Sequence, residues 1–124
     1  PVTAPLISPK TYLKSLDIYQ KNILSDNTHD SLMTVEPFKR YTWSESGPIN
    51  YELGLKHLPS QELKELYFVN DGILIAPRKK MIEWSYFHGP NPYKMPLDRI
   101  ESTDIDDGMD LELAKFYYEK YISK

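Results

Sequence analysis

The stretch LPSQELKELYFVNDG, residues 58 to 72, carries the clearest local signals in this chain of 124 residues. Ser60, directly after Pro59, is a typical N-cap, because its hydroxyl can accept a hydrogen bond from a free backbone N–H of the first helical turn. Gly72 is a typical stop, since glycine accepts the left-handed backbone that ends many helices. Apolar side chains recur between them at helical spacing: Leu63, Leu66 and Tyr67. We therefore predict a short amphipathic helix that ends in a sharp turn.

Helices are also predicted at both ends of the chain. Ser8-Pro9 combines an N-cap with a proline in the first turn, and apolar residues close to a 3.6-residue period follow it to residue 24. Residues 109 to 122 carry a broad apolar face behind an acidic lead-in, which predicts a final helix.

The segments between these helices favour strands. Residues 32 to 43 predict one or two strands broken at Pro37, followed by a turn at 44 to 48. Residues 73 to 87 predict an antiparallel hairpin with the basic tip Arg78-Lys79-Lys80. Of the remaining segments, we expect a short helix or a strand at 49 to 56, an irregular crossing or edge segment at 88 to 96 and a short strand at 97 to 100.

Together these elements predict an α+β fold, in which a small, mainly antiparallel sheet packs with N-terminal, central and C-terminal helices. The length predicts a single domain over residues 1 to 124. Residues 1 to 8 hold two prolines and are expected to form an extended N-terminal arm.

The composition excludes several classes of function. A net charge of −3 argues against a dedicated nucleic-acid binder, which needs a basic face. The chain has no cysteine, so it has no disulfide framework and no thiolate metal site, which fits a reducing compartment and predicts a cytoplasmic protein. No secretory signal is recognisable, and the apolar runs are too short to cross a bilayer.

The residue pattern also argues against catalysis. Pro1 could act as an N-terminal base of the tautomerase type, but Pro5 is incompatible with the regular strand that such a base needs. His29, His57 and His88 lack the spacing of zinc ligands, although His57 and His88 could form an acid/base pair of a small hydrolase or nuclease. Nucleophile-elbow and phosphate-loop motifs are missing. We predict no catalytic residue, metal or cofactor.

An acidic run precedes and enters the final helix, with no basic residue between Arg99 and Lys115. Its spacing does not fit a calcium loop, because a Lys falls at the twelfth position counted from Asp104. Helix capping explains part of the run, and a negative patch for a basic partner is the alternative interpretation. The acidic residues that we expect to bind a partner are Glu101, Asp104, Asp106 and Asp107, with Trp84 and Tyr93 as aromatic anchors.

Residues 52 to 59 (ELGLKHLP) and 63 to 72 (LKELYFVNDG) resemble the core signature of the SUKH superfamily. In that family an E-x-x-L-G segment runs into Leu-Pro, and a short helix then leads to an Asn-Gly or Asp-Gly turn that opens the sheet. Residues 95 to 100 (MPLDRI) look like a later strand of the family. The resemblance covers about residues 49 to 100.

The resemblance implies a non-enzymatic protein-binding domain. Bacterial members of the family are mostly immunity proteins that bind and neutralise a cognate toxin, and fungal relatives regulate cell-wall synthesis and signalling. A basic toxin is then the expected partner. The alternative is a subunit or scaffold domain of a larger eukaryotic or viral assembly, which docks through the N-terminal arm and the Tyr-rich final helix. The ten tyrosines suit an interface, and half-buried strands favour them as well.

Overall fold

In the computed structural model, which describes residues 2 to 124, the chain forms three α-helices and two small sheets. The expected α+β fold is confirmed. Pro1 lies outside the described residues, and so does the prediction of an N-terminal proline base. The described chain divides into two compact units: the first comprises the residues up to Glu36 together with Val69–Lys124, and the second is Pro37–Phe68.

A three-stranded sheet contains β1 (Ser31–Phe38), β4 (Leu66–Ile75) and β5 (Pro92–Pro96), in the order β4-β1-β5. Strands β1 and β5 are parallel, from Ser31 opposite Pro92 to Val35 opposite Pro96, whereas a mainly antiparallel sheet was expected. Pro37 does not break β1, contrary to expectation. It lies beyond the five residues that pair with β5, so its missing N–H removes no hydrogen bond to that strand.

The helices at both ends of the chain are confirmed. Helix α1 (Pro9–Ile18) continues as the π-helical segment η1 (Tyr19–Ser25), and the hydroxyl of Ser8 caps it by accepting a hydrogen bond from the N–H of Thr11 at 3.2 Å. Helix α3 (Gly108–Tyr117) continues as the π-helical segment η3 (Tyr118–Ile122). In the described part of the chain, no helix combines the length and the apolar content that crossing a bilayer requires.

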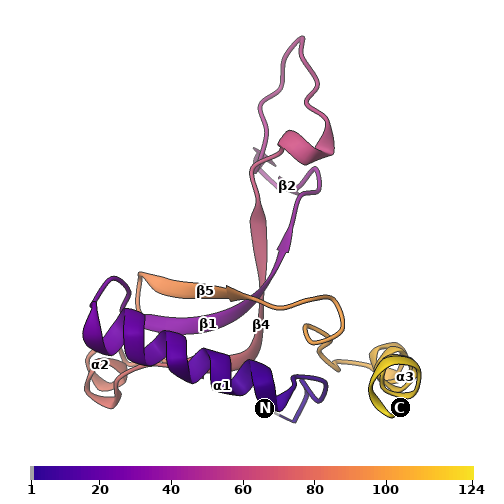
Figure 1. The fold of residues 1–124 in the computed structure, drawn as a ribbon. Coiled ribbons are helices and arrows are strands. Elements are labelled where there is room, and N and C mark those ends of the chain that lie inside the picture. Colours follow the sequence, from indigo (N-terminus) through magenta and orange to yellow (C-terminus); the bar gives the residue numbers. More distant parts are fainter. Residues whose placement is uncertain (1) are drawn as a thin grey trace. The chain divides into compact units, whose positions relative to one another are not determined.

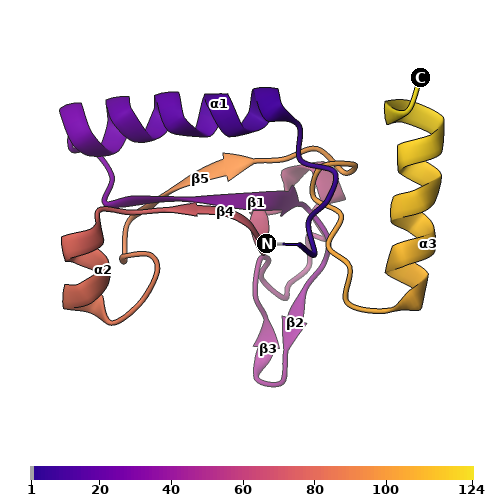
Figure 2. The same cartoon turned by 90° about the horizontal axis from the view of Figure 1, so that it is seen from below.

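The core of the first unit lies where α1 runs along the sheet (Figures 1 and 2). Leu32 and Val35 of β1 are completely shielded from solvent, and Met95 of β5 is 1% exposed. The N-terminal segment contributes Ala4 and Ile7 to this core, and its Leu6 is buried as well. Burial of these apolar side chains supplies the main stabilisation of the unit.

The predicted helix within residues 58 to 72 is wrong. Only the 3₁₀ turn η2 (Ser60–Glu62) forms, Leu63 is already extended, and β4 begins at Leu66. The reason is local propensity: Tyr67, Phe68 and Val69 favour strands, and this preference outweighs the helical spacing of the apolar residues. What looked like a helix stop is an irregularity inside β4, where Asp71 adopts φ +52°.

A buried polar network holds this irregularity. The Asn70 side-chain oxygen accepts hydrogen bonds from the Thr34 hydroxyl at 2.8 Å and from the Gly72 N–H at 3.1 Å. The same Thr34 hydroxyl accepts a hydrogen bond from the Ile73 N–H at 2.9 Å. Gly72 packs closely against Ile7: a Cβ there would lie 2.5 Å from Cδ1 of Ile7, so a larger residue would require the Ile7 side chain to shift. Asp71, not the glycine, takes the left-handed conformation.

The hairpin predicted over residues 73 to 87 is also wrong. Ile73–Ile75 completes β4, and the supposed basic tip begins helix α2 (Arg78–Trp84), because Arg, Lys, Met and Glu are good helix formers. Residues 97 to 100 form a turn in place of the expected strand, since the Asp98 side chain accepts hydrogen bonds from the N–H groups of Ile100 and Glu101. Residues 49 to 56 form neither helix nor strand. The segment 88 to 96 contains β5, which lies at the edge of the sheet as one of the two expected alternatives.

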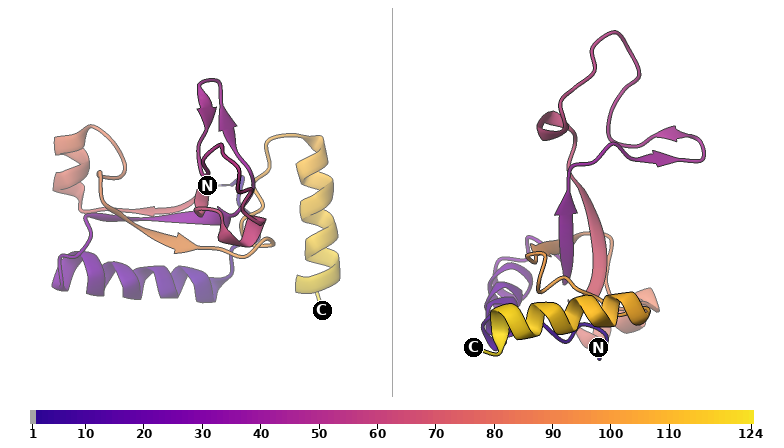
Figure 3. Two further views of the ribbon diagram at one scale, coloured as in Figure 1. Left: turned by 90° about the horizontal axis from the view of Figure 1, so that it is seen from above. Right: turned by 90° about the vertical axis from the view of Figure 1, so that its right-hand side faces the viewer.

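The second unit is built around the short antiparallel hairpin of β2 (Trp43–Ser44) and β3 (Gly47–Pro48), which Figure 3 shows clearly. This confirms the predicted turn at residues 44 to 48. The unit also contains ring contacts, among them Phe38 stacked on Phe68 and His57 stacked on Tyr41, with centroid distances of 4.3 Å and 4.7 Å.

Candidate functional site

The acidic run lies at the N-terminus of α3, where part of it caps the helix. The Asp107 carboxylate accepts hydrogen bonds from the N–H groups of Met109 at 2.8 Å and Asp110 at 3.0 Å. The Asp110 carboxylate in turn accepts from the N–H groups of Asp106 and Asp107, which completes a capping box. Asp106 therefore contributes its backbone, and its exposed carboxylate accepts no hydrogen bond within the described chain.

Glu101 ties the start of α1 to the loop before α3. Its carboxylate accepts hydrogen bonds from the Ser8 N–H at 2.8 Å and from the Thr11 hydroxyl at 2.7 Å. Burial alone would raise the pKa of Glu101. The hydrogen bonds from Ser8 and Thr11 and the charge of Lys14 lower the pKa by more than burial raises it, so the pKa lies below its ordinary value. Glu101 thus already has intramolecular partners for its charge.

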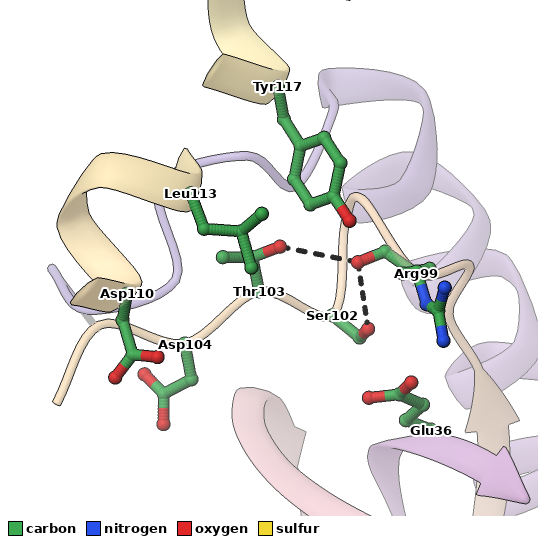
Figure 4. A pocket seen from close by; sticks show the side chains of 8 residues that line it. All are labelled: Glu36, Arg99, Ser102, Thr103, Asp104, Asp110, Leu113 and Tyr117. Carbon is green, nitrogen blue, oxygen red and sulfur yellow. Dashed lines mark hydrogen bonds between the residues drawn. The ribbon is translucent and has the colours of Figure 1, made fainter. Parts of the chain in front are cut away.

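A polar cleft of about 440 Å³ lies beside α3 (Figure 4). One wall is the loop after β5, with Arg99, Ser102, Thr103 and Asp104, and Glu36 of β1 completes it. The other wall is α3, which contributes Asp110, Leu113 and Tyr117. Of the predicted binding residues, Asp104 alone lines this cleft.

Hydrogen bonding leaves part of the cleft unsatisfied. The hydroxyls of Ser102 and Thr103 both donate to the carbonyl oxygen of Arg99, each at 3.2 Å. One carboxylate oxygen of Asp104, Oδ1, is enclosed and receives no hydrogen bond. Glu36 and the Arg99 guanidinium form no ion pair within the described residues. Within residues 2 to 124, the cleft therefore holds charged side-chain atoms that have no hydrogen-bond or ion-pair partner.

A second, largely apolar groove runs along the other side of α3. It consists of two neighbouring hollows of about 420 and 340 Å³ that share Pro5, Leu6 and Tyr118. Tyr121 and Ile122 extend one hollow, and Leu111 and Ala114 line the other. The groove thus lies between the N-terminal segment and the helix α3–η3.

Most of the large apolar side chains on helix α3 and η3 are exposed. Ala114 is 4% exposed, whereas Met109 is 82% exposed. Six further large apolar side chains on this element have 41% to 53% of their surface exposed: Leu111, Leu113, Phe116, Tyr118, Tyr121 and Ile122. Four of these side chains, Leu111, Tyr118, Tyr121 and Ile122, line the apolar groove. Single exposed apolar residues are ordinary, but several grouped at one groove indicate an interaction surface.

The two predicted aromatic anchors have intramolecular contacts. Trp84 packs directly over Gly89, where a Cβ would lie 2.5 Å from a carbon of its ring. Tyr93 meets the ring of His29 edge-on at 5.1 Å and also packs against the core. Both side chains are half-buried, so they contribute to the packing of the first unit.

The histidines contact aromatic rings of their own units. His57 belongs to the second unit and stacks on Tyr41, and His88 belongs to the first and meets Tyr86 edge-on at 4.9 Å. Within residues 2 to 124, no three His, Asp or Glu side chains are grouped to hold a metal ion.

Comparison of the chain with protein-family models gave no match, and comparison with curated protein sequences gave none either. Sequence reasoning located Asp104 but missed its neighbours in the cleft. The one usable signal was that Arg99 is the last basic residue before the acidic run.

Proposed function

We propose that this chain is a non-enzymatic, cytoplasmic protein-binding domain that binds its partner through the apolar groove and the exposed face of α3–η3. The observation that carries the proposal is the apolar surface of this element: Tyr118 and Tyr121 line the groove and are 51% and 53% exposed. Tyrosines placed in this way supply large contact area together with a polar tip, and they are enriched in interfaces.

An apolar surface of this kind supports a long-lived complex. Lasting interfaces resemble a protein core more than transient ones do, because their apolar side chains stay covered. Both partners expected from the sequence fit this description: a cognate toxin in an immunity complex, and the other subunits of a larger assembly. The immunity role is the narrower proposal, and the resemblance of residues 52 to 72 to the SUKH signature supports it.

The groove is tested with charge-introducing variants. We expect Tyr118→Glu and Tyr121→Glu each to abolish capture of the partner from cells of the source organism, because each places a charge in the apolar groove. Ile82→Glu on α2 is the matched control, since Ile82 is also exposed, at 61%. Capture is measured by affinity purification and quantitative mass spectrometry, with thermal melts to verify folding. Equal capture by all three variants would contradict the proposal.

The acidic residues are tested separately through association kinetics. Charge reversal at Asp107 would also remove a helix cap. The informative variant is therefore Asp106→Lys, because the carboxylate of Asp106 accepts no hydrogen bond within the described chain. If the partner is basic, this variant slows association at low salt and the difference shrinks as salt is added. An unchanged association rate at low salt would remove Asp106 from the interface.

A further inference from the structure

Helix α3 carries a second apolar surface on the side away from the groove. This outer stripe consists of Met109, Leu113 and Phe116, which are 82%, 44% and 50% exposed. Their spacing of four and then three residues places them on one side of the helix. The groove residues Leu111 and Tyr118 lie on nearly the opposite side, since successive residues are turned by about 100°. Figures 2 and 3 show α3 at one end of the first unit, with no other element of that unit beyond it.

The pattern of α3 differs from that of an ordinary surface helix. A helix at the surface of a domain usually has one apolar side, which packs on the core, and one polar side, which faces water. Helix α3 has apolar side chains on both sides, and Ala114 is its one buried residue. A helix with this pattern is typically covered on both sides. We therefore expect another molecule to cover the outer stripe.

The charges along the outer stripe are divided between the two ends of the helix. Asp106 and Asp110 lie at the N-terminal end. Lys120 lies near the C-terminal end, and its ammonium group is 5.2 Å from the centre of the Phe116 ring, which places it beside the stripe. Within residues 2 to 124, Lys120 forms no ion pair and the Asp106 carboxylate accepts no hydrogen bond. The stripe is thus acidic at its start and basic at its end.

The other charged side chains of this element contribute less to the pattern. Glu112 forms an ion pair with Lys115 at 2.8 Å, so these two charges largely compensate each other. Glu119 adjoins Lys120 in the sequence and is therefore turned by roughly 90° from it around the helix axis. The division into an acidic and a basic end therefore holds for the side of the helix that carries the stripe.

A second copy of the same helix, running antiparallel, complements this stripe. Antiparallel packing brings the acidic end of each helix to Lys120 of the other copy, and Leu113 of each copy beside Phe116 of the other. Two-fold symmetry forms each of these contacts twice. Parallel packing would place the two Lys120 side chains together, which is unfavourable. The antiparallel arrangement also sets the helix dipoles in opposite directions.

We infer that the outer stripe binds a second copy of this chain, through antiparallel packing of two α3 helices. A contact of one helix from each copy is small, so we expect a reversible dimer with a dissociation constant of about 10–100 µM. The inference goes beyond the proposed use of the groove and does not depend on it, because Leu111 and Tyr118 lie on the other side of the helix.

The first experiment measures the dimer by sedimentation velocity of the full chain, over about 1 µM to about 1 mM. We expect Leu113→Glu and Phe116→Glu each to weaken the dimer at least about tenfold, because each places a charge in an apolar contact. Leu111→Glu is the matched control, since Leu111 is on the same helix and is 41% exposed. It should dimerise within about twofold of the original chain. Thermal melts verify that each variant is folded.

The second experiment determines the orientation of the two helices. The chain has no cysteine, so an introduced thiol is the only one in each copy. In the antiparallel pair, Met109 of one copy lies near Lys120 of the other, whereas the two copies of either residue lie about 16 Å apart along the helix axis. A short bismaleimide should therefore cross-link a mixture of Met109→Cys and Lys120→Cys, but neither variant alone.

The results that would overturn the inference are distinct from failure of the groove. A chain that stays monomeric at every concentration, or one that Leu111→Glu and Leu113→Glu affect equally, does not dimerise through the stripe. Cross-linking of Met109→Cys to itself would contradict antiparallel packing. A monomeric chain whose Leu113→Glu variant loses partner capture would assign the stripe to another protein and also overturn the inference. Loss of capture by Tyr118→Glu with an intact dimer tests the groove alone.

Discussion

Each of the two units of this chain is stabilised internally in a different way. In the first unit, Leu32 and Val35 are completely shielded and belong to a continuous apolar core. In the second unit, the buried residues are Leu63 and the polar Asn50, and most other apolar side chains are exposed. The difference teaches that burial fixes the first unit, whereas directional hydrogen bonds and ring contacts fix the second.

Asn50 organises the second unit. Its side-chain amide donates to the carbonyl oxygens of Arg40 at 2.8 Å and Lys64 at 3.2 Å, and its side-chain oxygen accepts from the Thr42 N–H at 3.1 Å. One side chain therefore joins three segments of the unit. A unit organised in this way should respond to substitutions locally, while the first unit should respond as a whole.

The largest effect is expected from the core of the first unit. Leu32→Ala should lower the free energy of unfolding by about 2–5 kcal/mol, because it removes a fully buried side chain and leaves a cavity. Leu13→Ala on α1 is the control, since Leu13 is 64% exposed and should change stability by about 0.5 kcal/mol or less. Urea unfolding measures both. Similar losses for the two variants would contradict a first unit stabilised by burial.

The next largest effect is expected in the second unit, where Asn50 supplies the hydrogen bonds. Asn50→Ala should cost about 1 kcal/mol or more, because the partly buried carbonyl and N–H groups that Asn50 contacts lose their partner. We expect faster hydrogen exchange at the Thr42 amide and little change in the amides of β5. Glu52→Ala, at an exposed position with no hydrogen bond in the described chain, is the matched control. Equal acceleration of exchange in β5 would show that the two units do not respond separately.

A smaller effect is expected where the first unit itself depends on a polar contact. Asp107→Ala should cost about 0.5–2 kcal/mol, because it removes the side chain that caps α3. The loss should appear as fraying of α3, measured by circular dichroism and by chemical shifts of residues 108–112. Asp106→Ala removes an equal charge without removing a cap. If both variants lowered helicity equally, charge near the helix end would explain the effect and the cap would not.

Start and stop signals predicted some elements well and misled elsewhere. The caps at Ser8 and Asp107 could be read from the sequence, because a capping side chain acts within its own turn. At residues 58 to 72 the same kind of signal failed. Asn70 serves a contact with Thr34, 36 residues away in sequence, and Gly72 leaves room for Ile7. Local spacing contains no information on such distant partners.

The candidate site was predictable to the same limited degree. Asp104 was named from charge alone, whereas its place in a cleft depends on Glu36, Arg99 and Tyr117 coming together from three parts of the chain. Glu101 was also named from charge, but its carboxylate contacts Ser8 and Thr11 near the opposite end of the sequence. An acidic run shows where charge lies, and only the fold decides which charges remain available for a partner.

The smallest effect concerns Glu101 and depends on pH. Its pKa in the folded chain lies below the ordinary value of 4.5, so it stabilises the folded state fully above that value and the contribution is lost as pH falls through the lowered pKa. Glu101→Gln should therefore be less stable than the original chain at pH 7, and the difference should shrink at pH 3. Urea unfolding at both values measures this. If Glu101→Gln lowered the free energy of unfolding by the same amount at pH 3 as at pH 7, the shape of the side chain and not its charge would explain its contribution. The first unit would then depend on packing even where Glu101 contacts Ser8 and Thr11.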